Sequence, residues 1–152
     1  MRVRSRRRTD GRGVKSKEPA QSRSALTLEV PPRLDCLGEV RAFIDGAGLS
    51  RGLSLERIFD VKVCVSEAVA NAIEHAGAPV QVRVRLLRDR VVVEVTNKAG
   101  FCMSNRPVRL GRGGGFGLGL MVALADKVNF VGRRKGMTRV RLTFYRQADR
   151  RR

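Results

Sequence analysis

The chain has 152 residues, of which 42% are hydrophobic, and 32 basic side chains against 14 acidic ones give it a formal net charge of +18. This length and composition suit one globular domain with tails, and they exclude a wholly disordered or fibrous protein. The longest apolar run is far too short to cross a bilayer, so the sequence predicts no membrane span. The middle of the chain is basic even without its ends, which favours an acidic partner or ligand.

The three cysteines, Cys36, Cys64 and Cys102, are odd in number and lack the spacing of a metal site. We interpret them as reduced thiols of a cytoplasmic protein. No apolar segment follows the arginine-rich start, so the sequence predicts no signal peptide.

Both ends of the chain are basic tails around one domain. Residues 1–24 carry nine basic and two acidic side chains without apolar periodicity, so we expect them to be disordered. This tail is an arm for nucleic acid or an acidic partner, a solvating tail, or a product of an upstream start, with Val14 as an alternative beginning. Residues 25–146 form the predicted domain, and 147–152 form a basic C-terminal tail.

The domain begins with a strand and a helix. Residues 25–30 alternate between apolar and polar side chains, which predicts a strand ended by two prolines. Apolar residues then recur at helical spacing over 34–44, and we expect Gly46 and Gly48 to close this helix.

A longer helix follows, with Ser54 as its expected N-cap and Gly77 as its expected end. Its apolar residues form one stripe: Val61, Val65, Ala68, Val69, Ala72, Ile73 and Ala76. Glu67, Asn71 and Glu74 fall together on another side.

Glu67 and Asn71 lie one turn apart and therefore share a helix face. A glutamate there can accept a proton or orient a water, and an asparagine oxygen is a suitable ligand for Mg²⁺. The alternative is an ordinary solvated face of an amphipathic helix.

Two alternating runs at 80–86 and 91–96 predict an antiparallel hairpin with one buried face. A glycine-rich run at 111–119 leads into a third helix, and short strands are expected at 128–131 and 138–144. The order of elements predicts an α+β fold, a two-layer sandwich with a mostly antiparallel sheet and its helices on one face.

The glycine run can bind phosphate, because free backbone N–H groups and the positive end of a helix dipole would meet there. It lacks the lysine of a P-loop and the spacing of a dinucleotide fingerprint. The alternative is a flexible loop without a ligand.

Taken together, these motifs resemble the GHKL ATPase superfamily. VSEAVANAIEHAG at 65–77 resembles its N-box, and GFGLGLMVALADKV at 115–128 resembles its second glycine box. The likeness covers 25–146 and is greatest to the bacterial anti-sigma-factor serine/threonine kinases. It implies a Bergerat-type sandwich, with 101–111 as a compact ATP lid.

The resemblance also implies residue roles. Glu67 would be the general base, Asn71 would hold Mg²⁺, and Thr138 would assist near the nucleotide. Glycines of the second box would present backbone N–H groups to the phosphates of ATP: Gly115, Gly117 and Gly119.

The first glycine box departs from the family pattern. Gly100 and Phe101 match it, but Thr96 aligns with the aspartate that accepts a hydrogen bond from the adenine amino group, and Lys98 replaces a glycine. An alternative register puts Asn97 in the place of that aspartate.

The resemblance implies a cytoplasmic anti-sigma factor that uses ATP and Mg²⁺ to phosphorylate a serine on an anti-anti-sigma antagonist, and that sequesters a sigma factor in partner switching. Relatives of this kind often form homodimers. The degenerate first glycine box leaves a second hypothesis, a nucleotide-independent (pseudokinase) anti-sigma or partner-binding module. In a third, the basic tails bind nucleic acid.

Overall fold

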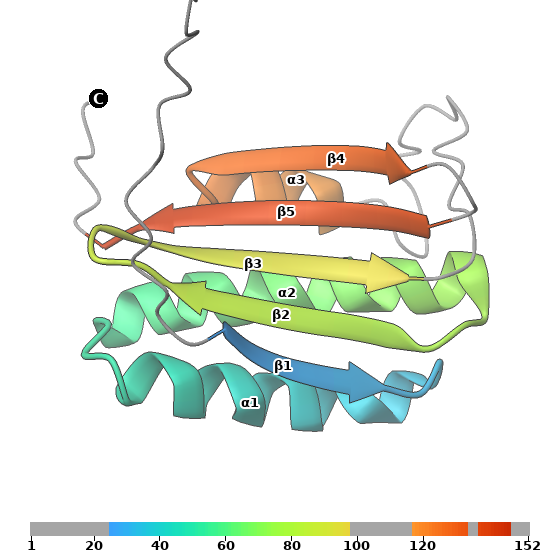
Figure 1. The fold of residues 1–152 in the computed structure, drawn as a ribbon, viewed down its shortest axis with the longest axis horizontal. Coiled ribbons are helices and arrows are strands. Elements are labelled where there is room, and N and C mark those ends of the chain that lie inside the picture. The colour runs from blue at the N-terminus through green and yellow to red at the C-terminus, as the bar shows by residue number, and fades with distance from the viewer. Residues whose placement is uncertain (1–24, 98–116, 134–136, 147–152) are drawn as a thin grey trace, which may run out of the picture.

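The computed structural model describes residues 25–97, 117–133 and 137–146. They form β1 (Ala25–Val30), a short 3-10 turn (Leu34–Cys36), α1 (Leu37–Leu49), α2 (Leu55–Ala76), β2 (Val80–Leu86), β3 (Arg90–Asn97), α3 (Gly117–Leu124), β4 (Lys127–Arg133) and β5 (Met137–Tyr145). The five strands make one antiparallel sheet in the order β1-β2-β3-β5-β4 (Figure 1). The predicted α+β fold class and order of elements are confirmed.

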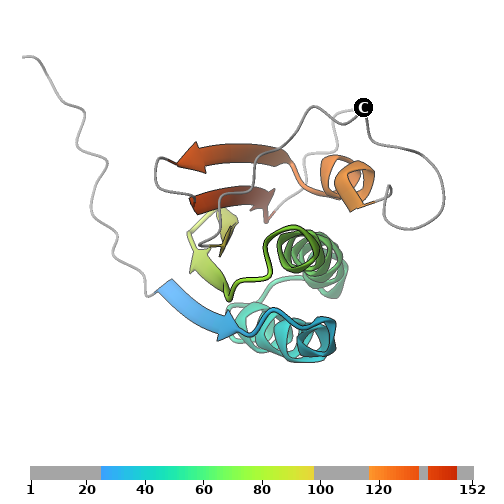
Figure 2. The same ribbon diagram turned by 90° about the vertical axis from the view of Figure 1, so that its right-hand side faces the viewer.

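The described residues form two layers, with their helices on one face of the sheet; no described element covers the other face, which we call the open face (Figure 2). The apolar stripe of α2 packs with the alternating residues of the central strands into one core. Its most buried members include Val61, Val65, Val69, Val80, Val82, Val84, Val93 and Leu142. No helix in the described ranges is long and apolar enough to cross a membrane.

Both predicted ends of α2 are confirmed. The Ser54 hydroxyl accepts a hydrogen bond from the backbone N–H of Arg57 at 3.2 Å, which satisfies a donor of the first turn. Gly77 follows the helix with φ of 58°, and its N–H donates to the carbonyl of Ile73. A side chain would disfavour this left-handed conformation, so glycine suits the position.

The predicted end of α1 is wrong. The helix runs through Gly46 and Gly48 to Leu49. A Cβ atom at Gly48 would lie 2.6 Å from Cγ1 of Ile58 on α2. Glycine therefore allows the two helices to approach closely here, and it does not end the helix.

The expectation of one buried face is wrong for β3. Val91, Val93 and Val95 pack under the helices, but on the open face Glu94 and Thr96 are only 5% and 7% exposed. β3 is the central strand, so the side chains of β2 and β5 reach over it from both sides. Long arginine side chains can cover a neighbouring strand in this way.

Candidate functional site

The expected site residues gather toward one end of the two-layer fold. The C-terminal half of α2, the end of β3 and the start of β5 lie at that end (Figure 1). Gly100 and Gly115, and the expected lid at 101–111, lie outside the described residues.

Glu67 lies close to the start of α3. A Cβ atom at Gly117 would lie 2.6 Å from Oε2 of Glu67 and 3.4 Å from its Cβ. The half-buried Glu67 side chain therefore lies against the first residue of α3. The first N–H groups of a helix lack partners within it and carry partial positive charge, so a carboxylate is favourable there.

The polar side of α2 is not uniformly solvated. Asn71 lies one turn beyond Glu67 and is half-buried like it, whereas Glu74 is exposed. Glu67 and Asn71 lie on the same side of α2, so a proton acceptor and an oxygen ligand would be one helical turn apart.

The end of β3 decides between the two registers of the first glycine box. Thr96 lies on the open face, where its hydroxyl accepts a hydrogen bond from Nε of Arg139 at 3.4 Å. Asn97 is directly opposite Val80, a core residue, and therefore faces the helices. The expectation that Thr96 stands in the place of the family's aspartate is corrected: only Asn97 is on the side of Glu67.

Asn97 is 3% exposed, and its Oδ1 has no hydrogen-bond partner among the described residues. A buried acceptor without a donor is costly, so this oxygen is suited to meet a donor from a ligand. Thr138 pairs with Asn97 in the β3–β5 ladder, which places its backbone at the same spot. Gly119 is exposed in the first turn of α3, and a Cβ atom there would meet nothing within 4 Å.

A buried arginine that we did not anticipate holds the far end of α3. Arg57 pairs with Asp60 at 3.1 Å and with Asp126, and it donates hydrogen bonds to the carbonyls of Tyr145 and Leu124 at 2.9 and 3.3 Å. These contacts tie α2 to the end of α3 and to β5. The three-residue spacing of Arg57 and Asp60 was readable as a helical pair, but Asp126 is distant in sequence.

The cysteines in the described part of the chain are free thiols, as expected, and their burial makes them unreactive. Cys36 and Cys64 are buried and form no disulfide. Burial, with a smaller contribution from Asp60, raises the pKa of the Cys64 thiol to about 12, so it stays protonated at neutral pH. Within the described ranges, no three His, Cys, Asp or Glu side chains form a group that could hold a metal ion.

Comparison with known proteins identifies the family of this chain. A family model described as a histidine kinase-like ATPase domain matches residues 30–144. The serine-protein kinase RsbW of Bacillus subtilis is 30% identical over 142 residues, covering 82% of this chain and 88% of the relative. The RsbW kinase of Bacillus pumilus is 32% identical over 122 residues, covering 68% of this chain and 75% of the relative.

Two solved structures support the fold. The RsbU and RsbW domains of a Mycobacterium tuberculosis protein match with a TM-score of 0.62 and 20% identity, over 80% of this chain and 32% of that one. The histidine kinase domain of a blue-light activated kinase from Erythrobacter litoralis matches with a TM-score of 0.50 and 21% identity, over 76% of this chain and 61% of that one. The chain belongs to the histidine kinase-like ATPase (GHKL) family, and proteins named serine-protein kinase RsbW are among its relatives.

Proposed function

We propose that this protein is a cytoplasmic anti-sigma factor of the serine/threonine kinase type. It would sequester a sigma factor and use ATP and Mg²⁺ to phosphorylate a serine on an anti-anti-sigma antagonist. The observation that carries the proposal is the contact of Glu67 with Gly117, because it places a carboxylate beside the glycine-rich start of α3. The relatives named serine-protein kinase support the same class of reaction.

The described residues fit ATP and Mg²⁺. Gly117 leaves room beside Glu67 that any side chain would fill, and the space around Gly119 is open. Among the described residues no donor reaches the buried Oδ1 of Asn97, and the adenine amino group is a suitable donor. When bound, Mg²⁺-ATP would supply the phosphoryl group and part of the neutralising charge.

In this proposal each residue has a positioning or proton-transfer role. Glu67 would take the proton from the serine hydroxyl as its oxygen attacks, and Asn71 would hold the metal ion through its side-chain oxygen. Backbone N–H groups at the start of α3 would hold the phosphates, and Thr138 would assist near the nucleotide. Such a site works mostly by orientation and charge stabilisation.

Asn97 would meet the base with a neutral amide in place of the carboxylate of the family pattern. A hydrogen bond to a charged group contributes about 1.5–3 kcal/mol, and a neutral one contributes about 1 kcal/mol. We therefore expect weaker ATP binding than in relatives with the aspartate, and Asn97→Asp should strengthen it.

Calorimetric titration of the full chain with Mg²⁺-ATP tests the nucleotide site. We expect saturable binding that weakens in Asn71→Ala and is unchanged in Asn129→Ala, a matched control on an exposed part of β4. The absence of binding at millimolar ATP would overturn the kinase proposal.

Catalysis is tested separately with Glu67→Gln. This variant should still bind ATP and its protein partners but fail to phosphorylate the antagonist, while the exposed Glu39→Gln on α1 should behave like the wild type. Loss of partner binding in Glu67→Gln would instead make Glu67 a structural residue.

The second candidate is a partner-binding module that works without nucleotide. It is favoured by the first glycine box, where a neutral Asn97 takes the place of the aspartate and Ala99 takes the place of the glycine two residues later. This candidate predicts that Mg²⁺-ATP leaves the melting temperature unchanged while the chain still captures a sigma factor.

A further inference from the structure

An arginine cluster surrounds one carboxylate on the open face of the sheet. Oε1 of Glu94 on β3 accepts a hydrogen bond at 2.9 Å from Nε of Arg141 on β5, and Nη2 of Arg141 forms an ion pair with the same oxygen at 2.8 Å. Nη1 of Arg139 and Nη2 of Arg85 approach the same oxygen at 3.7 and 3.8 Å. Three guanidinium groups thus share one negative charge.

Positive charge exceeds negative charge around this cluster. Arg83 lies directly opposite Glu94 on β2, and it is exposed and makes no ion pair within the described part of the chain. Lys127 on β4 adds another exposed cation two strands away. On the strands of this face, the other acidic side chain in the described ranges is Glu29 of the edge strand β1.

The carboxylate of Glu94 is ionised and paired with the arginines of the cluster. Burial alone would raise the pKa of its carboxyl, but the hydrogen bond from Arg141 and the charges of Arg139, Arg141 and Arg85 outweigh burial and hold this pKa below its ordinary value. Nε of Arg85 is also buried without a hydrogen-bond partner in the described residues. Three guanidinium groups against one carboxylate leave the cluster with a net positive charge.

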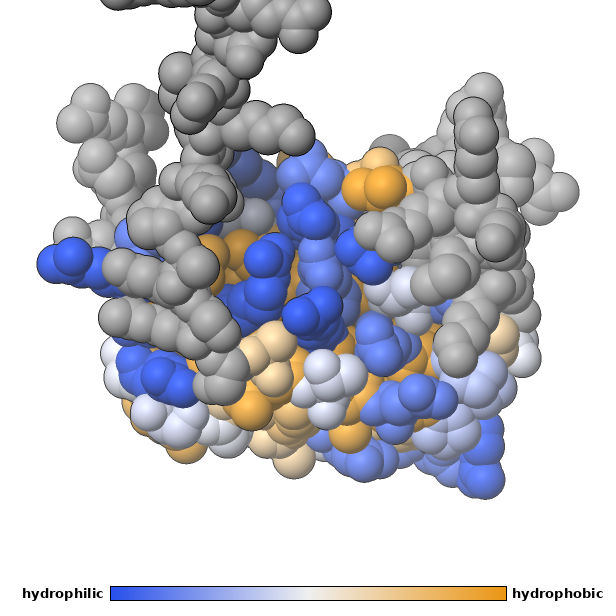
Figure 3. All heavy atoms as spheres, viewed as in Figure 1, coloured by the Kyte–Doolittle hydropathy of each residue, from blue (hydrophilic) through white to orange (hydrophobic). Residues whose placement is uncertain are grey.

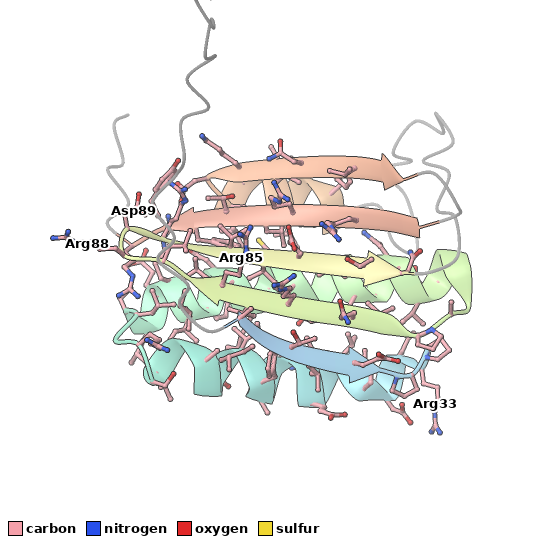
Figure 4. The ribbon with its side chains drawn as sticks, viewed as in Figure 1. Arg33, Arg85, Arg88 and Asp89 are labelled. Carbon is pink, nitrogen blue, oxygen red and sulfur yellow. The ribbon has the colours of Figure 1, made fainter. Side chains whose placement is uncertain are left out.

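The arginines are placed to meet a ligand from the open side. Arg83 and Arg141 flank Glu94 on adjacent strands, about 5 Å away on either side. Figure 3 shows hydrophilic side chains gathered over the middle of this face, and Figure 4 shows Arg85 lying across it. Planar guanidinium groups match carboxylates through paired hydrogen bonds.

We infer that the open face of the sheet binds an acidic segment of a partner protein, with Arg83, Arg85 and Arg141 contacting its carboxylates. This surface is separate from Glu67 and Asn71, which lie in the helical layer, so it does not depend on the proposed kinase reaction. The charge of the face carries the inference, because excess positive charge here complements a run of aspartates or glutamates.

Other occupants fit this face less well. A second copy would bring the same positive face against it, which costs energy. Sheet surfaces that bind single-stranded nucleic acid use exposed aromatic rings to stack bases. The aromatic ring described on this face, Tyr145, is at the end of β5, with Nζ of Lys127 at 5.9 Å from its centre.

The test measures binding of a labelled polyglutamate peptide to the full chain by fluorescence anisotropy at physiological salt. The face variant is Arg83→Gln with Arg85→Gln. The control, Arg41→Gln with Arg88→Gln, changes the net charge equally but lies on α1 and at the hairpin tip, where Arg88 points away from the sheet (Figure 4). The tails are the same in all three proteins, and thermal unfolding checks that each is folded.

We expect the face variant to lose roughly tenfold in affinity and the control less than about twofold. Equal losses would overturn the inference, because net charge alone would then explain binding. It would also be overturned if the face variant lost more affinity for oligothymidine or duplex DNA than for the peptide. Analytical ultracentrifugation tests whether a second copy occupies the face. If the wild type is a dimer and the face variant is a monomer, the face binds a second copy and the inference is overturned.

Discussion

Replacing Arg57 by methionine should destabilise the protein strongly. The Arg57 side chain is 9% exposed, and its partners Asp60 and Asp126 are 11% and 30% exposed. Removing one member of a buried ion pair costs about 3–5 kcal/mol, because the remaining charge is left uncompensated. Asp126 keeps part of its hydration, so we expect the lower end, about 3 kcal/mol. This is a large part of the roughly 5–15 kcal/mol of a typical domain.

Urea unfolding of the full chain, followed by circular dichroism, measures this loss. The matched control is Arg41→Met, the same change at an exposed helical position of α1, which should alter the free energy of unfolding by less than about 0.5 kcal/mol. Arginine and methionine have similar helix propensities, so the comparison isolates the buried contacts.

A further variant separates the causes of the loss. Adding Asp60→Asn and Asp126→Asn to Arg57→Met removes the uncompensated charges and should restore part of the stability. The reasoning is refuted if Arg57→Met costs no more than Arg41→Met. If the added changes restore nothing, the lost hydrogen bonds to the carbonyls of Leu124 and Tyr145 explain the effect instead.

Two other changes test the site and the open face. Gly117→Ala should displace the carboxylate of Glu67, since the new Cβ would lie 2.6 Å from Oε2. Because that carboxylate ends a flexible side chain, the free energy of unfolding should change by less than about 1 kcal/mol. The control Gly46→Ala, where the added Cβ meets open space, should change it by a similar amount. Phosphoryl transfer to the proposed antagonist should fall on the order of 10- to 100-fold in Gly117→Ala, and unchanged transfer would contradict the role of Glu67. Glu94→Gln should lower the free energy of unfolding by about 1–3 kcal/mol at pH 7. The arginines hold the pKa of Glu94 below its ordinary value, so its contribution is complete above the unfolded pKa of about 4.3 and disappears as pH falls through the lower folded pKa. Urea unfolding at several pH values measures this. If wild type and variant still differ equally in free energy of unfolding below that pH range, the ion cluster is not the source of the difference.

The sequence by itself determined the features that depend on neighbours a few residues apart. The Ser54 cap and the Gly77 end of α2 are local hydrogen-bond and backbone effects, and both are confirmed. Alternation predicted the buried face of β2, and the order of elements predicted the sandwich. Glu67 and Asn71 were candidates from the sequence because helix periodicity alone puts them on one face.

Only the tertiary structure decided what depends on contacts between distant segments. Period-two alternation shows that Thr96 and Asn97 point to opposite faces, but the β2–β3 register was needed to show that Asn97 faces the helices. Glu94 is buried on the open face because arginines of two other strands reach it, and Gly48 is a packing residue because Ile58 lies against it. In the same way, Glu67 and Gly117 are fifty residues apart in sequence, and only the packing of α3 against α2 brings them together.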